Sequence, residues 1–493
     1  MKLKSHSAWS FAVPLLLLLA CSAEPVATTP EVSPLVLEPC EVEGVELFCG
    51  TYGVWEDRAS GQGRRLDLAV VRLPALDPLG GPPVFFFAGG PGQASTTLAP
   101  FFARSPFRRQ HDVVFVDQRG TAGNHHLDCE LWPAVEDSAE TTGDDLQRYL
   151  DPEFVVEPFV RCRDRLAKHF DLTRYDTRTA VDDFDEVRAA LGYDEIFVAG
   201  GSYGTRVALT YLERHGDHVR GAVLNGVMPR ANSNPLHHAR GAQRSFDKLL
   251  AACASQEECA THHPDLAADL AAVLDRLDGG PAAVTVDHPL DGSRVEVRLS
   301  REAFAEALRG MLYRDASWRR LPALLSRAAA GDLAPFASYA IETNQSLFGN
   351  LAYGMLLSVT CAEDLARIDP DSVPAATEGT FYGDHRVRSQ LAVCEAWPQR
   401  PLDPSWGEAV RSSAPVLMLS GDLDPVTPPH WAEALRESLP NSRHVIVPRT
   451  HFVRDACTRD VTAEFLRTAD PETLDVGCVG TLEPLILETA ASG

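Results

Sequence analysis

The sequence predicts an α/β fold, with a mostly parallel sheet covered by helices on both sides and interrupted by a helical insertion. Short apolar, β-branched or aromatic runs alternate with helical patterns, which is typical of strands buried on both faces of a parallel sheet. The runs occupy residues 66–73, 84–88, 113–117, 196–199, 222–224, 416–419 and 445–447. Between the runs at 222–224 and 416–419 the pattern changes to helical stretches such as 267–277 and 301–312. We therefore expect a core in two parts, 41–230 and 401–493, with a helical cap at 231–400.

The N-terminus carries a targeting signal. Lys2 and Lys4 precede an apolar run at 11–20, which is too short to span a bilayer, and Cys21 follows directly. This pattern predicts a lipoprotein signal peptide at 1–20 with Cys21 as the lipidated residue, or else an ordinary secretory signal cleaved nearby. Residues 22–39 are rich in Pro, Thr, Ala and Glu, so we expect a flexible tether at 21–40. The protein is expected to be exported, with membrane contact only through a lipid.

The net charge argues against one class of partner, and the cysteine content indicates the compartment in which the protein works. The 493 residues carry 45 Lys and Arg against 69 Asp and Glu, and the net charge of −24 argues against nucleic acid as a partner. Eleven cysteines minus Cys21 leave ten, so five disulfides can form in an oxidising compartment. Nearest-neighbour pairing would join 40–49, 129–162, 253–259, 361–394 and 457–478, although sequence alone leaves the connectivity open. The sequence has no CxxC pair, and we expect neither a metal nor a cofactor.

The strongest local signal is the segment Gly200-Gly201-Ser202-Tyr203-Gly204. Apolar residues at helical spacing between Asp176 and Gly192 predict a helix, with Thr179 as its cap and Gly192 as its end, that leads into the strand at 196–199. Another amphipathic helix follows the segment, ending at Gly216. A GxSxG between strand and helix predicts a nucleophile elbow, in which glycines permit a strained turn that lifts the serine hydroxyl above the sheet. Ser202 is therefore the expected nucleophile.

A serine nucleophile requires an imidazole base and a carboxylate that orients it. In the α/β-hydrolase fold these residues follow the serine in the order acid, then His, each after a late strand. The strand at 416–419 leads to Asp422 and Asp424, and the strand at 445–447 leads to His451. We expect Asp424 as the acid and His451 as the base, with Asp422 as the competing acid.

The oxyanion of a tetrahedral intermediate requires backbone N–H donors. In this fold one donor belongs to the residue after the nucleophile, here Tyr203, and another to the loop after an earlier strand. That loop is Gly89-Gly90-Pro91-Gly92, in which Pro91 has no N–H to donate. Gly90 is the expected second donor.

Four segments together resemble the tripeptidyl aminopeptidase and proline iminopeptidase group of serine peptidases. They are AGGPG at 88–92, DQRGT at 117–121, GGSYG at 200–204 and GDLDPVTP at 421–428. The resemblance spans roughly 60–460 and implies removal of one or a few residues from peptides with a free amino terminus. Ala88 replaces the His that is usual in proline iminopeptidases, which favours the tripeptidyl branch. We interpret Asp117 and Arg119 as scaffold residues.

Three functions are compatible with these motifs to different degrees. The leading hypothesis is an exported serine exopeptidase that works through an acyl-enzyme and acts on peptides with a free amino terminus. An esterase or amidase would use the same triad, because the cap selects the substrate. A non-catalytic binding protein would not need the full set of catalytic residues. For a peptidase, Glu363 and then Asp364 in the cap are the expected partners of the substrate ammonium.

Overall fold

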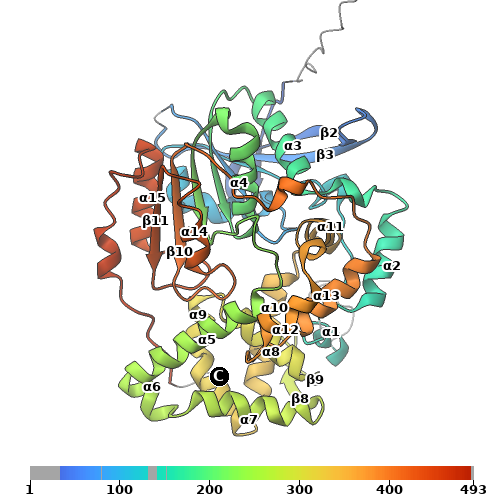
Figure 1. The fold of residues 1–493 in the computed structure, drawn as a ribbon, viewed down its shortest axis with the longest axis vertical. Helices are drawn as coiled ribbons and strands as arrows, with labels where there is room; N and C mark the ends of the chain where they lie inside the picture. Colours follow the sequence, from blue (N-terminus) through green and yellow to red (C-terminus); the bar gives the residue numbers. More distant parts are fainter. Residues whose placement is uncertain (1–33, 79, 132–141, 152, 490–493) are drawn as a thin grey trace, which may run out of the picture. The chain divides into compact units, whose positions relative to one another are not determined.

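The central sheet contains nine strands in the part of the chain that the computed structural model describes, residues 34–78, 80–131, 142–151 and 153–489 (Figure 1). The strand order is β1-β2-β3-β5-β4-β6-β7-β10-β11, antiparallel from β1 to β5 and parallel from β5 to β11. The strands are β1 (Glu38–Val42), β2 (Val45–Asp57), β3 (Gln62–Leu73), β4 (Val84–Phe87), β5 (Val113–Val116), β6 (Ile196–Gly201), β7 (Val219–Asn225), β10 (Val416–Gly421) and β11 (Ser442–Val447). Cys21 and the expected signal peptide lie outside the described residues.

Every strand expected from the apolar runs is present, and the mostly parallel sheet is confirmed. The antiparallel pair β1 and β2 was not expected, because its mixed polar and apolar residues do not form a continuous apolar run. β1 begins inside the segment expected as a tether. Alternate side chains of β4 enter different cores, since Phe85 packs with helices α3 and α4 whereas Val84 packs with α15. Helices therefore cover both faces of the sheet.

The core helices begin and end for local reasons. They are α2 (Val156–Leu166), α3 (Thr177–Ala190), α4 (Tyr203–His215), α14 (Pro429–Ala434) and α15 (Ala456–Thr468), whereas the short helix α1 (Gly143–Gln147) packs through Leu146 into the cap cluster. The expected cap of α3 was wrong, because the carboxylate of Asp176, not the hydroxyl of Thr179, caps this helix. Asp176 accepts the Thr179 N–H at 2.8 Å, so the capping residue lies three positions earlier than expected.

The insertion between β7 and β10 is mainly helical, as expected. Its elements are α5 (His238–Ser255), α6 (Glu257–His262), α7 (Leu266–Asp278), β8 (Ala282–Asp287), β9 (Arg294–Leu299), α8 (Arg301–Met311), α9 (Asp315–Ala329), α10 (Ala334–Phe348), α11 (Tyr353–Glu363), α12 (Val373–Thr377) and α13 (His385–Ala396). The β8–β9 hairpin was not expected. Helices α5 to α10 enclose an apolar cluster of their own, and α6, α7 and the hairpin lie at the bottom of Figure 1.

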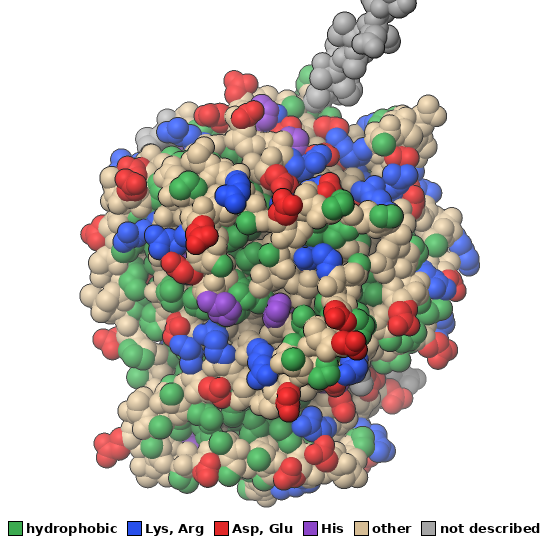
Figure 2. Space-filling view, in the orientation of Figure 1, with side chains coloured by type: hydrophobic (Ala, Val, Ile, Leu, Met, Phe, Trp, Pro, Cys, Tyr) green, Lys and Arg blue, Asp and Glu red, His purple; other side chains and the backbone are tan. Residues whose placement is uncertain are grey.

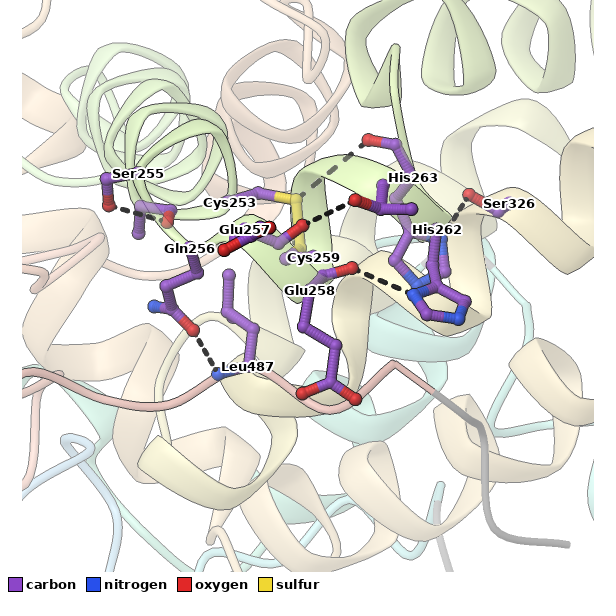
Figure 3. The surroundings of a disulfide bond; sticks show 12 residues. Cys253, Ser255, Gln256, Glu257, Glu258, Cys259, His262, His263, Ser326 and Leu487 are labelled. Carbon is purple, nitrogen blue, oxygen red and sulfur yellow. Dashed lines mark hydrogen bonds between the residues drawn. A yellow bond between two sulfur atoms is a disulfide. The ribbon is translucent and has the colours of Figure 1, made fainter.

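Several segments depart from a simple division into core and cap. Helix α11 belongs by sequence to the expected cap, yet its side chains join the same apolar cluster as α3 and α4. Conversely, Leu485 and Leu487 near the C-terminus are buried in the cap cluster. Figure 3 shows the second contact, in which the Gln256 side chain accepts a hydrogen bond from the Leu487 N–H at 2.9 Å. The end of the segment expected as the second part of the core, residues 401–493, thus packs against the cap.

Five disulfides link cysteines within the described residues, and they follow nearest-neighbour pairing. They join Cys40 to Cys49, Cys129 to Cys162, Cys253 to Cys259, Cys361 to Cys394 and Cys457 to Cys478. Figure 3 shows the bridge between the end of α5 and α6. Several disulfides indicate an extracytoplasmic protein. Among the described helices, none has the length and apolar character needed to cross a bilayer. Acidic and basic side chains are interspersed over the face in Figure 2.

Candidate active site

Ser202 lies on a strained turn between β6 and α4. Its backbone angles are φ 56° and ψ −124°, and a residue with a side chain rarely adopts this positive φ. The flanking glycines are required by close packing: a Cβ on Gly200 would lie 2.2 Å from Gly204 O, and a Cβ on Gly204 would lie 2.1 Å from Phe87 O. The geometry is that of a nucleophile elbow.

Asp424 and His451 form a buried pair on the loops after β10 and β11. The Asp424 carboxylate accepts the His451 Nδ1–H at 2.7 Å. Its other hydrogen bonds come from Val426 N at 2.8 Å, Thr427 N at 2.9 Å and Thr427 Oγ1 at 2.6 Å. Burial acts to raise the pKa of Asp424, but His451 and the hydrogen bonds from Thr427 outweigh it and hold the pKa below its usual value. Asp424 is therefore ionised at neutral pH.

Asp422, the competing candidate for the acid, forms an ion pair with a residue of the cap. The Asp422 side chain is 44% exposed and pairs with Lys248 of α5. Two cap residues instead hold the backbone of this loop, because Arg244 donates to Asp424 O at 2.7 Å and Ser245 donates to Leu423 O at 2.6 Å. The structure thus brings Asp424, and not Asp422, to His451.

The turn of Ser202 and the ring of His451 meet at the end of β7. The Ser202 N–H donates to Asn225 O at 2.9 Å. Gly226 comes next in the chain with a positive φ of 67°, and a Cβ there would lie 3.0 Å from His451 Cε1. Only glycine leaves room for the imidazole at this position. Since Nδ1 of His451 donates to Asp424, its Nε2 is the nitrogen that can accept a proton.

The two expected oxyanion donors are both available. In the described part of the chain, neither the Tyr203 N–H nor the Gly90 N–H has a protein acceptor. The glycine loop lies against the elbow, because a Cβ on Gly89 would lie 3.4 Å from Ser202 Cβ. Gly90 itself has a φ of 104°, which favours glycine. Backbone N–H groups without acceptors beside a serine are the donors that an oxyanion requires.

The expected amine-binding residues are occupied by partners inside the chain. Glu363 is 1% exposed and accepts the Thr177 N–H at 2.7 Å and the Thr177 hydroxyl at 2.8 Å. Asp364 is fully buried, and both of its oxygens accept from Arg206 at 2.9 Å. Glu363 also borders a cavity of about 310 Å³ that none of Ser202, Asp424 and His451 lines. A substrate ammonium would have to displace these contacts.

Burial raises the pKa of Glu363 to about 8, although Arg206 and the Thr177 N–H act in the opposite direction. Asp364 takes both hydrogen bonds from the guanidinium, while Glu363 lies 3.7 Å from it. One buried cation therefore faces two carboxyl groups, which favours the neutral form of Glu363 near pH 7.

Sequence reasoning missed several residues that support His451. Thr427 bonds both members of the pair, and the GDLDPVTP segment could have revealed it, because Thr three residues after Asp is typical of a carboxylate turn. Asp315 of α9 accepts the Thr450 N–H at 3.0 Å, and the Tyr313 ring packs edge-on against the imidazole at 5.2 Å. These two cap residues lie more than a hundred positions away in sequence, so no local signal indicates them.

The described residues contain no cluster of three or more His, Cys, Asp or Glu side chains arranged to hold a metal ion.

The scaffold interpretation of the loop at 117–124 fits the contacts there. Arg119 is completely buried and forms two hydrogen bonds with Asp183, at 2.6 and 2.9 Å. Asp117 accepts the N–H and the hydroxyl of Thr96. These contacts hold the strand ends around the elbow in place.

Comparison with known proteins places this geometry in a family. Serine protease Hip1 of Mycobacterium tuberculosis is 27% identical over 495 residues, which cover 88% of each chain. Carboxylesterase B of the same species is 27% identical over 411 residues, covering 77% of this chain and 76% of the relative. Tripeptidyl aminopeptidase of Streptomyces coelicolor is 22% identical over 478 residues, covering 89% and 84%. A family model described as alpha/beta hydrolase fold matches residues 82–453, and the chain belongs to this family.

Proposed function

We propose that the protein is a serine hydrolase in which Ser202 is the nucleophile, His451 the base and Asp424 the residue that orients the base. The observation that carries the proposal is the buried Asp424–His451 hydrogen bond of 2.7 Å beside the elbow that holds Ser202. Asp424 fixes the proton of the imidazole on Nδ1, so Nε2 is left to accept the proton of the serine hydroxyl.

The reaction then proceeds through an acyl-enzyme. Ser202 Oγ bonds to the carbonyl carbon while His451 takes its proton, and the carbonyl electron pair moves to oxygen, where the Tyr203 and Gly90 N–H groups stabilise it. The bond to the leaving group breaks, and His451 gives the proton to the departing amine or alcohol. Water repeats the sequence on the acyl-enzyme: His451 takes its proton and returns it to Ser202, releasing the acid.

The substrate class that we propose is peptides, from which the enzyme releases short N-terminal units. The full-length similarity to a serine protease and to a tripeptidyl aminopeptidase supports this class. The segments AGGPG, DQRGT and GDLDPVTP carry the resemblance to this group of peptidases. We further propose that the enzyme works outside the cytoplasm, attached through a lipid on Cys21. Esterase activity is the second candidate, because a carboxylesterase is also among the relatives.

Substrate profiling separates the two candidates. The purified enzyme is tested on tripeptidyl and aminoacyl reporter amides with a free or a blocked amino terminus, and on short acyl esters. A peptidase of the proposed type cleaves the free tripeptidyl amide with the highest kcat/KM and discriminates against the blocked one. Cleavage of esters alone would favour the esterase. The Ser202→Ala variant, folded by circular dichroism, must be inactive on every substrate that the wild type cleaves.

A further inference from the structure

Helix α11 contacts the loop that carries one proposed oxyanion donor. The Ala352 N–H, just before the helix, donates to Gly92 O at 3.0 Å. The approach is close, because a Cβ on Gly92 would lie 2.8 Å from Ala352 O. The Leu351 side chain lies 3.4 Å from the position of a Cβ on Gly90. The N-terminal end of α11 therefore packs directly on the glycine loop.

The other end of α11 reaches the second proposed donor through a chain of buried hydrogen bonds. Glu363, its last residue, binds the N–H and the hydroxyl of Thr177. The Thr177 hydroxyl lies 2.7 Å from the Tyr203 hydroxyl, which also accepts from the Gln118 amide at 3.0 Å. Tyr203 is the residue whose N–H is the proposed donor next to Ser202. Its ring is fully buried, so these contacts fix the whole residue.

A second contact holds the same helix turn. Asp364 binds both Nη atoms of Arg206, which lies three residues after Tyr203 on α4. Asp364 also accepts the Asn234 N–H at 3.2 Å. Arg206 is completely buried, and a bidentate carboxylate–guanidinium pair in such surroundings has little freedom to move. The first turn of α4 is thus anchored twice to the C-terminal end of α11.

We propose that α11 is a strut that sets the relative position of the two oxyanion donors, with Glu363 and Asp364 as its positioning residues. The inference rests on the proposed function. An eleven-residue helix spans about 16 Å and is stiff along its axis, and the Cys361–Cys394 bridge ties this one to α13. Donor placement must be accurate to about 0.5 Å, and loss of one donor lowers kcat by about 10²–10³-fold. Both carboxyl groups then act on catalysis through Tyr203 and Arg206, not on the substrate.

Two substitutions at one position separate positioning from amine binding. Glu363→Leu removes both acceptors of Thr177, whereas Glu363→Gln keeps one acceptor for the N–H and places a donor beside the hydroxyl. We expect Glu363→Leu to lower kcat by about 10–100-fold. This loss is smaller than the loss of about 10²–10³-fold in kcat that follows complete removal of one oxyanion donor. KM should stay within about twofold, equally for a free-amine peptide amide and a neutral ester. Glu363→Gln should recover most of kcat. The matched control is Asp371→Asn, at an exposed acid nearby in sequence.

A transition-state readout identifies the oxyanion hole as the affected part. A boronic acid that forms a tetrahedral adduct with Ser202 should bind the Glu363→Leu variant more weakly by the same factor as kcat falls, because its oxygen uses the same donors. Tyr203→Phe keeps the backbone N–H and the ring but removes the hydrogen bond to Thr177. It therefore provides the same test of donor positioning if Glu363→Leu does not fold. Combined with Glu363→Gln, it should add no further loss beyond the larger single effect.

The outcomes are distinct. A fluorophosphonate probe that labels Ser202 of the wild type supports the proposed function. No labelling, together with an active Ser202→Ala variant, overturns that function and the strut with it. With the wild type labelled, unchanged kcat in folded Glu363→Leu and Tyr203→Phe overturns the strut alone. A KM increase restricted to free-amine peptides in Glu363→Gln also overturns it and returns Glu363 to amine binding.

Discussion

Replacing Asp424 by Asn tests the catalytic geometry most directly. Two backbone N–H groups, from Val426 and Thr427, donate to Oδ1 of Asp424 at 2.8 and 2.9 Å, so the amide oxygen of an Asn must occupy that position. The amide NH₂ then faces His451 Nδ1, which was 2.7 Å from Oδ2. A donor at this position moves the imidazole proton to Nε2, and the base can no longer take the proton of Ser202.

The expected loss follows from this change of tautomer. A base in the wrong tautomer lowers kcat by about 10⁴-fold, which corresponds to about 5.5 kcal/mol of activation free energy. KM should change little, because Asp424 is 0% exposed and does not reach the substrate. Stopped-time assays on an activated ester and on a peptide amide measure both constants, and circular dichroism verifies the fold.

The matched control is Asp422→Asn, two residues away. Asp422 is partly exposed and pairs with Lys248, so loss of its charge should leave kcat within about threefold. A folded Asp424→Asn variant that keeps more than about a tenth of wild-type kcat would refute the assignment of the acid. So would a larger loss in Asp422→Asn than in Asp424→Asn.

Three further predictions address the elbow, the buried acid and the anchor. Gly204→Ala should prevent stable folding or lower the Tm steeply, because its Cβ would lie 2.1 Å from Phe87 O, whereas Gly216→Ala, with open space around the Cβ, should leave the Tm nearly unchanged; equal melting curves would contradict the packing argument. Glu363 binds its proton more tightly in the folded chain, since burial raises its pKa from 4.5 to about 8. Stability should therefore fall as the pH rises from about 4.5 to 8, by up to about 5 kcal/mol, and urea titrations at pH 5 and 8.5 should show this fall reduced in Glu363→Gln; parallel pH dependence in both proteins would argue against it. Cys21→Ser should release active enzyme from the membrane fraction, and retention of the variant after a high-salt wash would count against the lipid anchor.

The core of the fold could be predicted from the sequence because the residues that indicate each strand are neighbours in the chain. The inner parallel strands are buried on both faces and must therefore be continuous apolar runs, as in Val113–Val116. Gly200 and Gly204 near Ser202 could be predicted equally well, since a Cβ there would lie only 2.1–2.2 Å from backbone oxygens and no other residue fits. The order of serine, acid and histidine follows from the order of strands in the sheet.

Local signals failed where the deciding contact is long-range. The position of Glu363 in the segment 231–400 suggested a substrate-facing carboxylate, but an acid next to another acid has no sequence feature that reveals a buried partner. Thr177 and Arg206 lie 186 and 158 residues away from their partners Glu363 and Asp364. Similarly, nothing near His451 indicates that Tyr313 and Asp315 of the cap support it.

The sequence by itself determined the parallel strands, the elbow, and the serine and histidine of the candidate triad, because strand burial, backbone strain and chain order leave signals in neighbouring residues. Only the tertiary structure decided which acid faces His451 and which part of the cap belongs to the core. Asp422 and Asp424 differ by two positions, and the packing of α5 leaves one beside Lys248 and the other beside the imidazole. Helix α11 is apolar on most sides, so it is buried in the core, and burial gave its terminal acids partners within the protein.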